Sequence, residues 1–267
     1  MAVNLNLSRL LKLIRKQWIE NARIYLLSTL ALAGILSLVF IFWLFNGSLS
    51  FNEETLYVIF TIGLYIGGVV FASMSFNMLT DKRKGVYWLG FPASHLEKLL
   101  TVIFFNLVVF TVVYSLCFYL IKTLAVSYLK GMMAANPLYS YHLADSGGFM
   151  EVFPNFLYGF VAIQAFYVLG SIYFSRFTFI MTTVIGIALV FIFMWFTISL
   201  INNNIPDGFK WDGFYVKKYE GDIGTDGGFY KYQLPALAFS TLLFLLKFIW
   251  APVFWLITYF RLKEKEI

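Results

Sequence analysis

Side chains that bind metals or form disulfides are scarce in this 267-residue chain. It has a single cysteine, Cys117, and two histidines, His95 and His142. One cysteine excludes a disulfide framework and a cysteine-based metal site within one chain. Neither histidine lies in a His-x-x-x-His spacing, and the topology inferred below places the two on opposite sides of a membrane. We therefore expect no metal site.

Charge is also scarce, and apolar residues are abundant. Only 13% of the residues are charged, 60% are hydrophobic and 21% are aromatic, and the mean hydropathy is +0.78. Soluble domains are about 25% charged and roughly 45–50% apolar, so this excess indicates a lipid environment. The formal net charge of +6 is modest. No basic patch is interleaved with solvent-facing aromatics, which argues against nucleic-acid binding.

The apolar residues are grouped into stretches that predict an all-α integral membrane protein with six transmembrane helices. Each stretch has about 20–27 residues, enough to cross a hydrocarbon core of about 30 Å. They lie near residues 24–45, 56–79, 99–122, 154–175, 177–200 and 234–260. A tight turn at Arg176 separates the fourth stretch from the fifth.

Residues 4–23 have a different pattern, in which Leu7, Leu11 and Trp18 recur at helical spacing opposite Arg9 and Lys16. This amphipathic pattern predicts a helix that lies in the membrane interface, with its basic side toward anionic headgroups. A signal peptide is disfavoured because no small-residue cleavage site follows the apolar run.

Short basic segments set the predicted orientation. Residues 4–23, residues 80–98, Arg176 and the tail "RLKEKEI" all fall on one side if every stretch spans once. The positive-inside rule makes that side, with both termini, cytoplasmic. On the other side, residues 202–233 contain Asp212-Gly213 between aromatic runs, which is a hairpin signal. We expect a small β-containing extracytoplasmic cap there, between the fifth and sixth helices.

The candidate catalytic and nucleotide-binding motifs in the sequence are incomplete. Gly85 and Gly90 have the spacing of P-loop glycines, but a phenylalanine and a proline follow where the motif needs Lys and Ser/Thr. Asp222 and Asp226 loosely match a calcium loop whose third-position ligand and closing glutamate are absent, so a plain turn is favoured. Glu53 and Glu54 head the second span, where acidic residues favour a helix N-terminus. We expect no enzyme activity.

Two features within the spans each leave two interpretations open. The small residues Gly63, Gly67, Gly68 and Ala72 allow close helix approach, either within one bundle or at a subunit interface. Lys247 falls near the middle of the last predicted span. It is either a functional intramembrane charge or a lysine whose stem reaches the interface.

The segment at residues 80–98, a single cytoplasmic loop, concentrates charge and helix signals. It opens with the basic residues 82–84, continues through the apolar run 86–91, and ends with Ser94 and Glu97 in capping-box spacing. Gly90 and Pro92 break the apolar run. The pattern predicts a rigid elbow between the second and third spans; the alternative is a loop that is merely anchored to the bilayer.

Together with this loop, "FNMLTDKRKGVYWLGFPASHLEK", the order of parts resembles the membrane (permease) subunit of exporter-type ABC transporters of the bacterial type 2 class. That class has an amphipathic N-terminal elbow helix, six spans, and a coupling helix between the second and third spans. The segment "FPASHLEK" is similar to a Leu-Pro-Ala-Ser-x-x-Glu-Lys segment of bacterial membrane proteins grouped with this class. The family's outer element is usually made of short re-entrant helices, whereas residues 201–233 are polar and carry hairpin signals.

The resemblance implies a permease subunit in the bacterial cytoplasmic (inner) membrane. It would work as a homo- or heterodimer with a separate ATP-binding subunit, which would hold the ATP and Mg²⁺. It would move a hydrophobic or amphipathic substrate along a path between subunits. No cofactor is implied in this chain. The implied coupling surface comprises Arg83, Lys84, Tyr87, Trp88, Leu89 and Phe91. The alternative function is a non-transporting scaffold or assembly subunit that binds partners through the elbow and the outer cap.

Overall fold

The structure of the chain is a computed structural model. It describes residues 6–46, 49–80, 82–143, 146–174, 176–204, 209–212, 215–219, 229–233 and 236–265. The chain divides into two compact units, a main unit (Met1–Phe179 with Trp250–Ile267) and a second unit (Ile180–Ile249).

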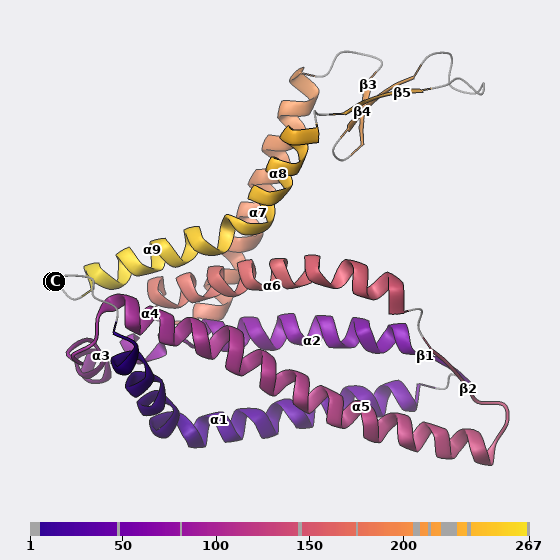
Figure 1. The fold of residues 1–267 in the computed structure, drawn as a ribbon, viewed down its shortest axis with the longest axis horizontal. Helices are drawn as coiled ribbons and strands as arrows, with labels where there is room; N and C mark the ends of the chain where they lie inside the picture. The colour runs from indigo at the N-terminus through magenta and orange to yellow at the C-terminus, as the bar shows by residue number, and fades with distance from the viewer. Residues whose placement is uncertain are drawn as a thin grey trace. The chain divides into compact units, whose positions relative to one another are not determined.

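The main unit is built almost entirely from helices (Figure 1). The helices are α1 (Leu7–Leu44), α2 (Glu53–Ser73), α3 (Lys82–Leu89), α4 (His95–Ile103), α5 (Phe110–Ala135), α6 (Ser146–Tyr173) and α9 (Trp250–Glu264). A 3₁₀ turn (Asn77–Thr80) follows α2, and a π-helical segment (Phe104–Val109) joins α4 to α5. The strands β1 (Ser50–Asn52) and β2 (Ser140–His142) form a two-stranded sheet.

Membrane-spanning character is confirmed for the described part of the chain. Five helical stretches are long and apolar enough to cross a bilayer. They are Leu7–Leu44, Glu53–Leu79, His95–Ala135, Glu151–Tyr173 and Thr178–Ser199. The chain is therefore an all-α, multi-pass membrane protein in its main architecture.

The sixth predicted span does not form one continuous helix, so this part of the prediction is not confirmed. Residues 234–260 contain two helices, α8 (Ala236–Phe248) and α9, each shorter than the roughly 20 residues that a span requires. The break has a local cause at Pro252, whose ring nitrogen cannot donate to the carbonyl of Phe248 and whose ring clashes with it. Proline is tolerated in the first turn of the new helix. Lys247 thus lies in the exposed last turn of α8 rather than in mid-span.

The N-terminal segment also differs from its predicted boundaries. Instead of an interfacial helix at residues 4–23 followed by a separate span, one continuous helix, α1, runs from Leu7 to Leu44. No proline or glycine occurs between Leu7 and Ala33, so nothing in the sequence ends the helix where its pattern changes. Figure 1 shows that α1 instead changes direction along its length.

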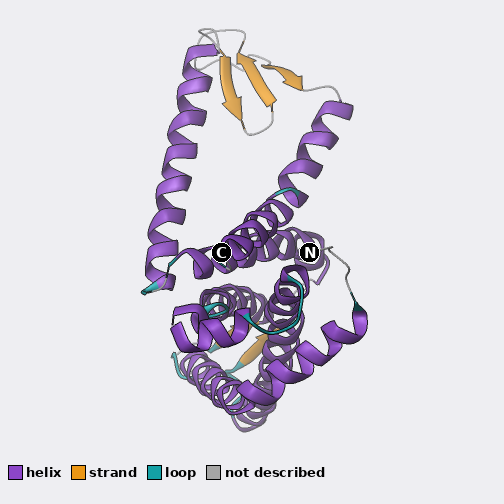
Figure 2. Ribbon diagram, turned by 90° about the vertical axis from the view of Figure 1, so that its left-hand side faces the viewer, coloured by secondary structure: helices purple, strands orange, loops and turns teal. Residues whose placement is uncertain are grey.

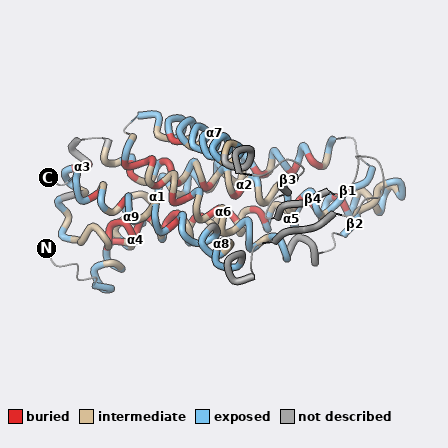
Figure 3. Tube along the Cα trace, turned by 90° about the horizontal axis from the view of Figure 1, so that it is seen from above, coloured by how far each residue is buried: buried red, intermediate tan, exposed pale blue. Residues whose placement is uncertain are grey.

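Two buried clusters hold the main unit together. The larger contains Phe40, Leu64, Tyr114 and Phe160, which come from α1, α2, α5 and α6. The smaller contains Phe76, Leu99, Val168 and Leu262 and lies where α4, α6 and α9 meet the end of α2. Figure 3 shows the buried residues gathered in the main unit, whereas most of the described part of α7 is exposed.

The loops that follow α1 and α5 pair with each other, which the sequence did not predict. β1 and β2 are parallel, with Ser50 opposite Ser140 and Asn52 opposite His142. Next to this pair, Lys122 Nζ lies 2.7 Å from a carboxylate oxygen of Glu53. The strand pair and the ion pair together join α2 and α5 at one end of the main unit.

The second unit consists of most of α7 (Thr178–Asn204), a three-stranded antiparallel sheet, and α8 (Figure 2). The strands are β3 (Phe209–Asp212), β4 (Tyr215–Tyr219) and β5 (Phe229–Gln233), in the order β3-β4-β5. Asp212 pairs with Tyr215, so the predicted hairpin forms at the expected place. The predicted tight turn is also confirmed: α6 ends at Tyr173, α7 begins at Thr178, and Phe177 between them has a φ of 51°.

Candidate functional site

The loop that resembles a coupling segment lies at the end of the main unit where α1 begins and α9 ends (Figure 1). Asn6, which caps α1, is hydrogen-bonded to Glu97 of α4. Leu262 of α9 belongs to the same buried cluster as Leu99 and Phe76. The first and last described segments of the main unit and the helix α3 therefore share one end of the bundle.

Ser94 caps α4 as the sequence predicts. Its backbone is extended (φ −68°, ψ 153°), and its hydroxyl oxygen accepts a hydrogen bond from the Glu97 N–H at 3.2 Å. In return, Glu97 Oε2 accepts from the Ser94 N–H at 2.9 Å. This reciprocal pair is a capping box, and it fixes the direction in which the chain enters the third span.

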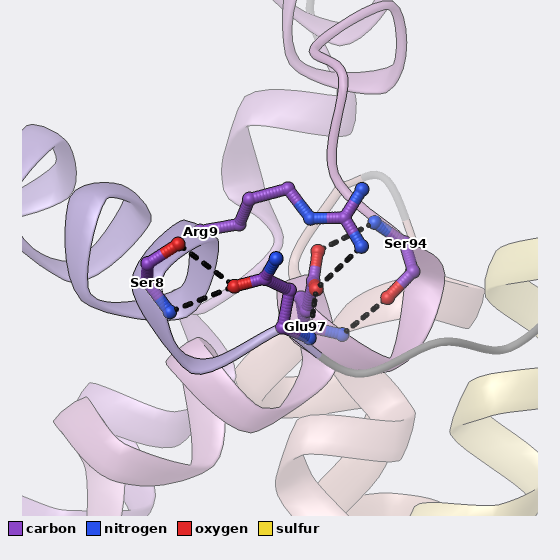
Figure 4. A network of polar contacts seen from close by, with 5 residues as sticks. Ser8, Arg9, Ser94 and Glu97 are labelled. Atoms are coloured by element: carbon purple, nitrogen blue, oxygen red, sulfur yellow. Dashed lines mark hydrogen bonds and ion pairs between the residues drawn. The ribbon is translucent and has the colours of Figure 1, made fainter.

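Glu97 has a second role, which joins α4 to the start of α1 (Figure 4). Its Oε1 accepts from the backbone N–H of Asn6 at 2.9 Å and lies 3.3 Å from Nη2 of Arg9. The Glu97 side chain is fully buried, with 0% of its surface exposed. One carboxylate thus receives backbone N–H groups from two helix N-termini, where the helix dipoles favour a negative charge.

Lys16 makes a second connection between α1 and the loop. Its Nζ lies 4.4 Å from the centroid of the Tyr87 ring and 3.8 Å from that of Phe91, within the range of cation–π interactions. Two residues of the predicted basic face, Arg9 and Lys16, therefore contact α4 and the loop of their own chain. No local sequence pattern relates these positions, which are far apart in the chain.

Within the predicted coupling surface, the described side chains take different directions. Trp88 is half-buried, with its ring 5.8 Å from that of Phe76 and 5.4 Å from Nζ of the buried Lys98. Tyr87 remains 62% exposed, and Val86, which was not predicted to belong to this surface, is 73% exposed. Trp88 thus fastens α3 to the bundle, whereas Val86 and Tyr87 form an outward surface. The side chains of Arg83, Lys84 and Leu89 lie outside the described residues.

The predicted small-residue row of α2 packs against neighbouring helices of the same chain. A β-carbon on Gly67 would come within 3.1 Å of the Phe110 ring, and one on Gly68 within 2.7 Å of the Phe160 ring. A β-carbon on Gly63 would collide with the hydroxyl of Tyr114, which donates to the Phe60 carbonyl at 2.9 Å. The next small residue in the row, Ala72, is fully buried. These contacts are those of packing within one bundle.

Among the described residues, no group of three or more His, Cys, Asp and Glu side chains is placed to hold a metal ion. Glu53 and Glu54 both lie in the first turn of α2, as the sequence predicts, and Glu53 also pairs with Lys122 of α5. Glu97 joins α1 to α4, and Lys16 joins α1 to Tyr87 of α3 and to Phe91; these contacts are together called the junction below.

Comparisons with known proteins do not narrow the function: no family model, no curated protein and no solved structure matches this chain. The functional argument therefore rests on the junction itself.

Proposed function

We propose that this chain is the membrane (permease) subunit of an ATP-driven transporter. In this proposal it works as a dimer and binds a separate ATPase subunit through the exposed side of α3. The observation that carries the proposal is that α3 is tied to its own bundle on one side while Val86 and Tyr87 stay exposed on the other. A surface that transmits force must be attached to the helices that it moves, and it must also be accessible to the partner that pushes on it.

The connections of α3 favour force transmission over simple anchoring. Basic and aromatic residues alone would hold a loop at the bilayer surface. This loop is also bound to α1 through Lys16, to the end of α2 through Trp88, and to α4 through the Ser94–Glu97 capping box. A push on Tyr87 would therefore reach the first three predicted spans together. Tilting these spans would open a path for a hydrophobic or amphipathic substrate.

In this proposal the chain does not hydrolyse ATP, and ATP and Mg²⁺ belong to the partner subunit. The expected location is a bacterial cytoplasmic membrane, with α3, the start of α1 and the end of α9 facing the cytoplasm.

The test is to purify the protein in a mild detergent, to identify the proteins that co-purify with it, and to measure the rate of ATP hydrolysis by the purified sample. Because interface energy concentrates in a few side chains, Val86→Ala/Tyr87→Ala should weaken association with the ATPase at least tenfold while the permease stays folded. A control is Leu143→Ala, which changes an exposed apolar residue beyond β2, at the other end of the main unit. If the wild-type protein never brings an ATPase with it, the transporter proposal fails.

A scaffold or assembly subunit is the second candidate, favoured by the three-stranded sheet that follows α7. Its edge strands β3 and β5 offer backbone groups for pairing with another protein. This candidate predicts a stable partner without ATPase activity, so the same purification distinguishes the two functions.

A further inference from the structure

Gln164 is a polar residue in the middle of a buried row of α6. The row consists of Phe160, Gln164, Val168 and Ile172, each of which is at most 2% exposed. Among the described residues, neither Oε1 nor Nε2 of Gln164 has a hydrogen-bond partner. Position 164 lies well inside the apolar stretch Glu151–Tyr173, where lipid offers no hydrogen bond either. The described arrangement therefore carries the cost of an unpaired amide in the membrane interior.

The amide packs against α2 at a glycine. A β-carbon on Gly68 would collide with Nε2 of Gln164 and would come within 2.7 Å of the Phe160 ring. One turn further along α2, Ala72 belongs to the same buried cluster as Val168. These five residues are here called the α2–α6 seam. The small residues of α2 let α6 approach closely, and the approach covers the amide.

A second buried amide with an unpaired oxygen contacts α2 nearer to α3. Asn106, in the π-helical segment, is 2% exposed, and its Nδ2 donates to Ser75 Oγ at 2.7 Å. Its Oδ1 has no hydrogen-bond partner within the described part of the chain. Ser75 lies about two turns after Gly68, so both residues are on the same side of α2. π-helical segments often occur at functional sites, and here one contributes to an incompletely paired surface beside α2.

Helix packing alone does not account for Gln164. Polar residues that hold membrane helices together form hydrogen bonds across the helix contact. Tyr65 of α2 does so, because its hydroxyl donates to the Phe156 carbonyl of α6 at 2.6 Å. Ser171, a buried polar residue of α6, donates instead to the Val168 carbonyl of its own helix. Gln164 does neither, so an apolar residue of similar size would stabilise the closed seam better.

The seam is placed where a movement of α3 would act on it. α2 is connected to α3 through the 3₁₀ turn and through the ring contact between Phe76 and Trp88. α6 packs against α9, where the rings of Phe166 and Phe254 are 5.3 Å apart. A displacement of α3 would therefore move α2 relative to α6 and open the seam.

We propose that the α2–α6 seam opens to water and that Gln164 then binds the polar group of the amphipathic substrate. A primary amide both donates and accepts hydrogen bonds, so it can pair with water, a hydroxyl or another amide. Because the closed seam leaves this amide unpaired, hydration favours opening even without an ATPase. The inference rests on the proposed transport function, and it places the polar part of the path within one subunit.

The experiment measures how fast a water-soluble reagent reaches the seam of the full-length protein in lipid nanodiscs, where both membrane faces are accessible. Ala72→Cys is introduced in a Cys117→Ser background, and a positively charged methanethiosulfonate reagent is added. We expect slow but measurable labelling of position 72. Adding Gln164→Leu, which removes the amide, should slow the labelling by about fivefold or more. The hydroxyl-bearing amphiphile 1-dodecanol should protect position 72, whereas dodecane should not.

Two controls separate opening of the seam from general loosening. Thr258 is fully buried in α9 and its hydroxyl already donates to the Phe254 carbonyl, so Thr258→Val should leave labelling of position 72 nearly unchanged. Leu36→Cys, at a buried position of α1 outside the seam, should be labelled much more slowly than position 72. Misfolding caused by Gln164→Leu would speed up labelling, which is the opposite of the expected result. If Ala72→Cys does not fold, Val168→Cys reports from the other side of the seam.

The inference fails if position 72 is labelled no faster than position 36, if Gln164→Leu and Thr258→Val change the rate equally, or if 1-dodecanol protects no better than dodecane. These measurements need no ATPase, so they are decided separately from the proposed function. If labelling follows Gln164 while no ATPase ever co-purifies, the opening stands and the transport function fails. If an ATPase co-purifies and labelling does not depend on Gln164, the transport function stands and this inference fails.

Discussion

The backbone N–H of Asn6 donates a 2.9 Å hydrogen bond to the carboxylate of Glu97, a residue 91 positions further along the chain. The same carboxylate completes the capping box of α4 and pairs with Arg9. A single side chain therefore sets the relative position of two helices that the sequence describes as separate elements.

We expect Glu97→Gln to lower the free energy of unfolding by about 2 kcal/mol. The amide cannot accept the two backbone N–H groups and the Arg9 contact as a carboxylate does, and the site is buried. Thermal unfolding in detergent measures the effect. The matched control is Glu264→Gln, because Glu264 forms an ion pair of similar chemistry with Arg261 on an exposed surface and should change stability little. Equal effects of the two substitutions would contradict the role given to Glu97.

Replacing Lys16 with methionine should loosen the contact between α1 and the loop. Methionine keeps the apolar length but removes the charge above Tyr87 and Phe91, a loss of about 1 kcal/mol, and also removes the weak pair with Glu20. Hydrogen exchange of the α3 amides should become faster. Lys12→Met, at an exposed position of the same helix, serves as the control and should leave α3 exchange unchanged.

Adding a methyl group to α2 should be costly where the helix is most closely packed. Gly68→Ala should destabilise the bundle by about 1–3 kcal/mol, because the new carbon would meet Gln164 and Phe160. At Gly34, where no side chain beyond the adjacent residues lies within 4 Å of the added carbon, the same change should be neutral or stabilise by up to about 1 kcal/mol through helix propensity. Unfolding titrations in mixed micelles compare the two, and similar losses would argue against the packing described for α2.

The predicted orientation can be tested at two positions at opposite ends of the main unit. In a Cys117→Ser background, Val86→Cys and Leu143→Cys both place a thiol at an exposed position. A membrane-impermeant reagent added to intact cells should label position 143 and not position 86, because basic residues mark the α3 side as cytoplasmic. The opposite labelling pattern would invert the topology.

Local features of the fold could be predicted from the sequence, and long-range ones could not. The Ser94–Glu97 capping box and the hairpin near Asp212 depend on residues a few positions apart, and both formed where the pattern placed them. The bond from Asn6 to Glu97 and the parallel pairing of Ser50 with Ser140 depend on tertiary approach. The spacing of residues along the chain does not indicate which distant segments come into contact.

At two places the hydropathy pattern and the backbone chemistry of the chain indicate different helix boundaries. The apolar run at residues 234–260 suggested one span, although Pro252 was a visible signal for a break after Phe248. The change of pattern near Arg23 suggested a helix boundary, although no residue there ends a helix. The direction of Trp88, toward Phe76 rather than outward, was not predictable because aromatic residues suit both places.

The parallel pairing of β1 with β2 has a consequence for biogenesis. Ser50 leaves the ribosome long before Ser140, so β1 has no partner while α2 and α5 are being inserted. At the other end of the main unit, the hydrogen bond between Asn6 and Glu97 cannot form until Glu97 has been synthesised. Each nascent chain therefore inserts its first helix before either of these two contacts can form. Translation arrested between α2 and α5 would leave α1 without both contacts.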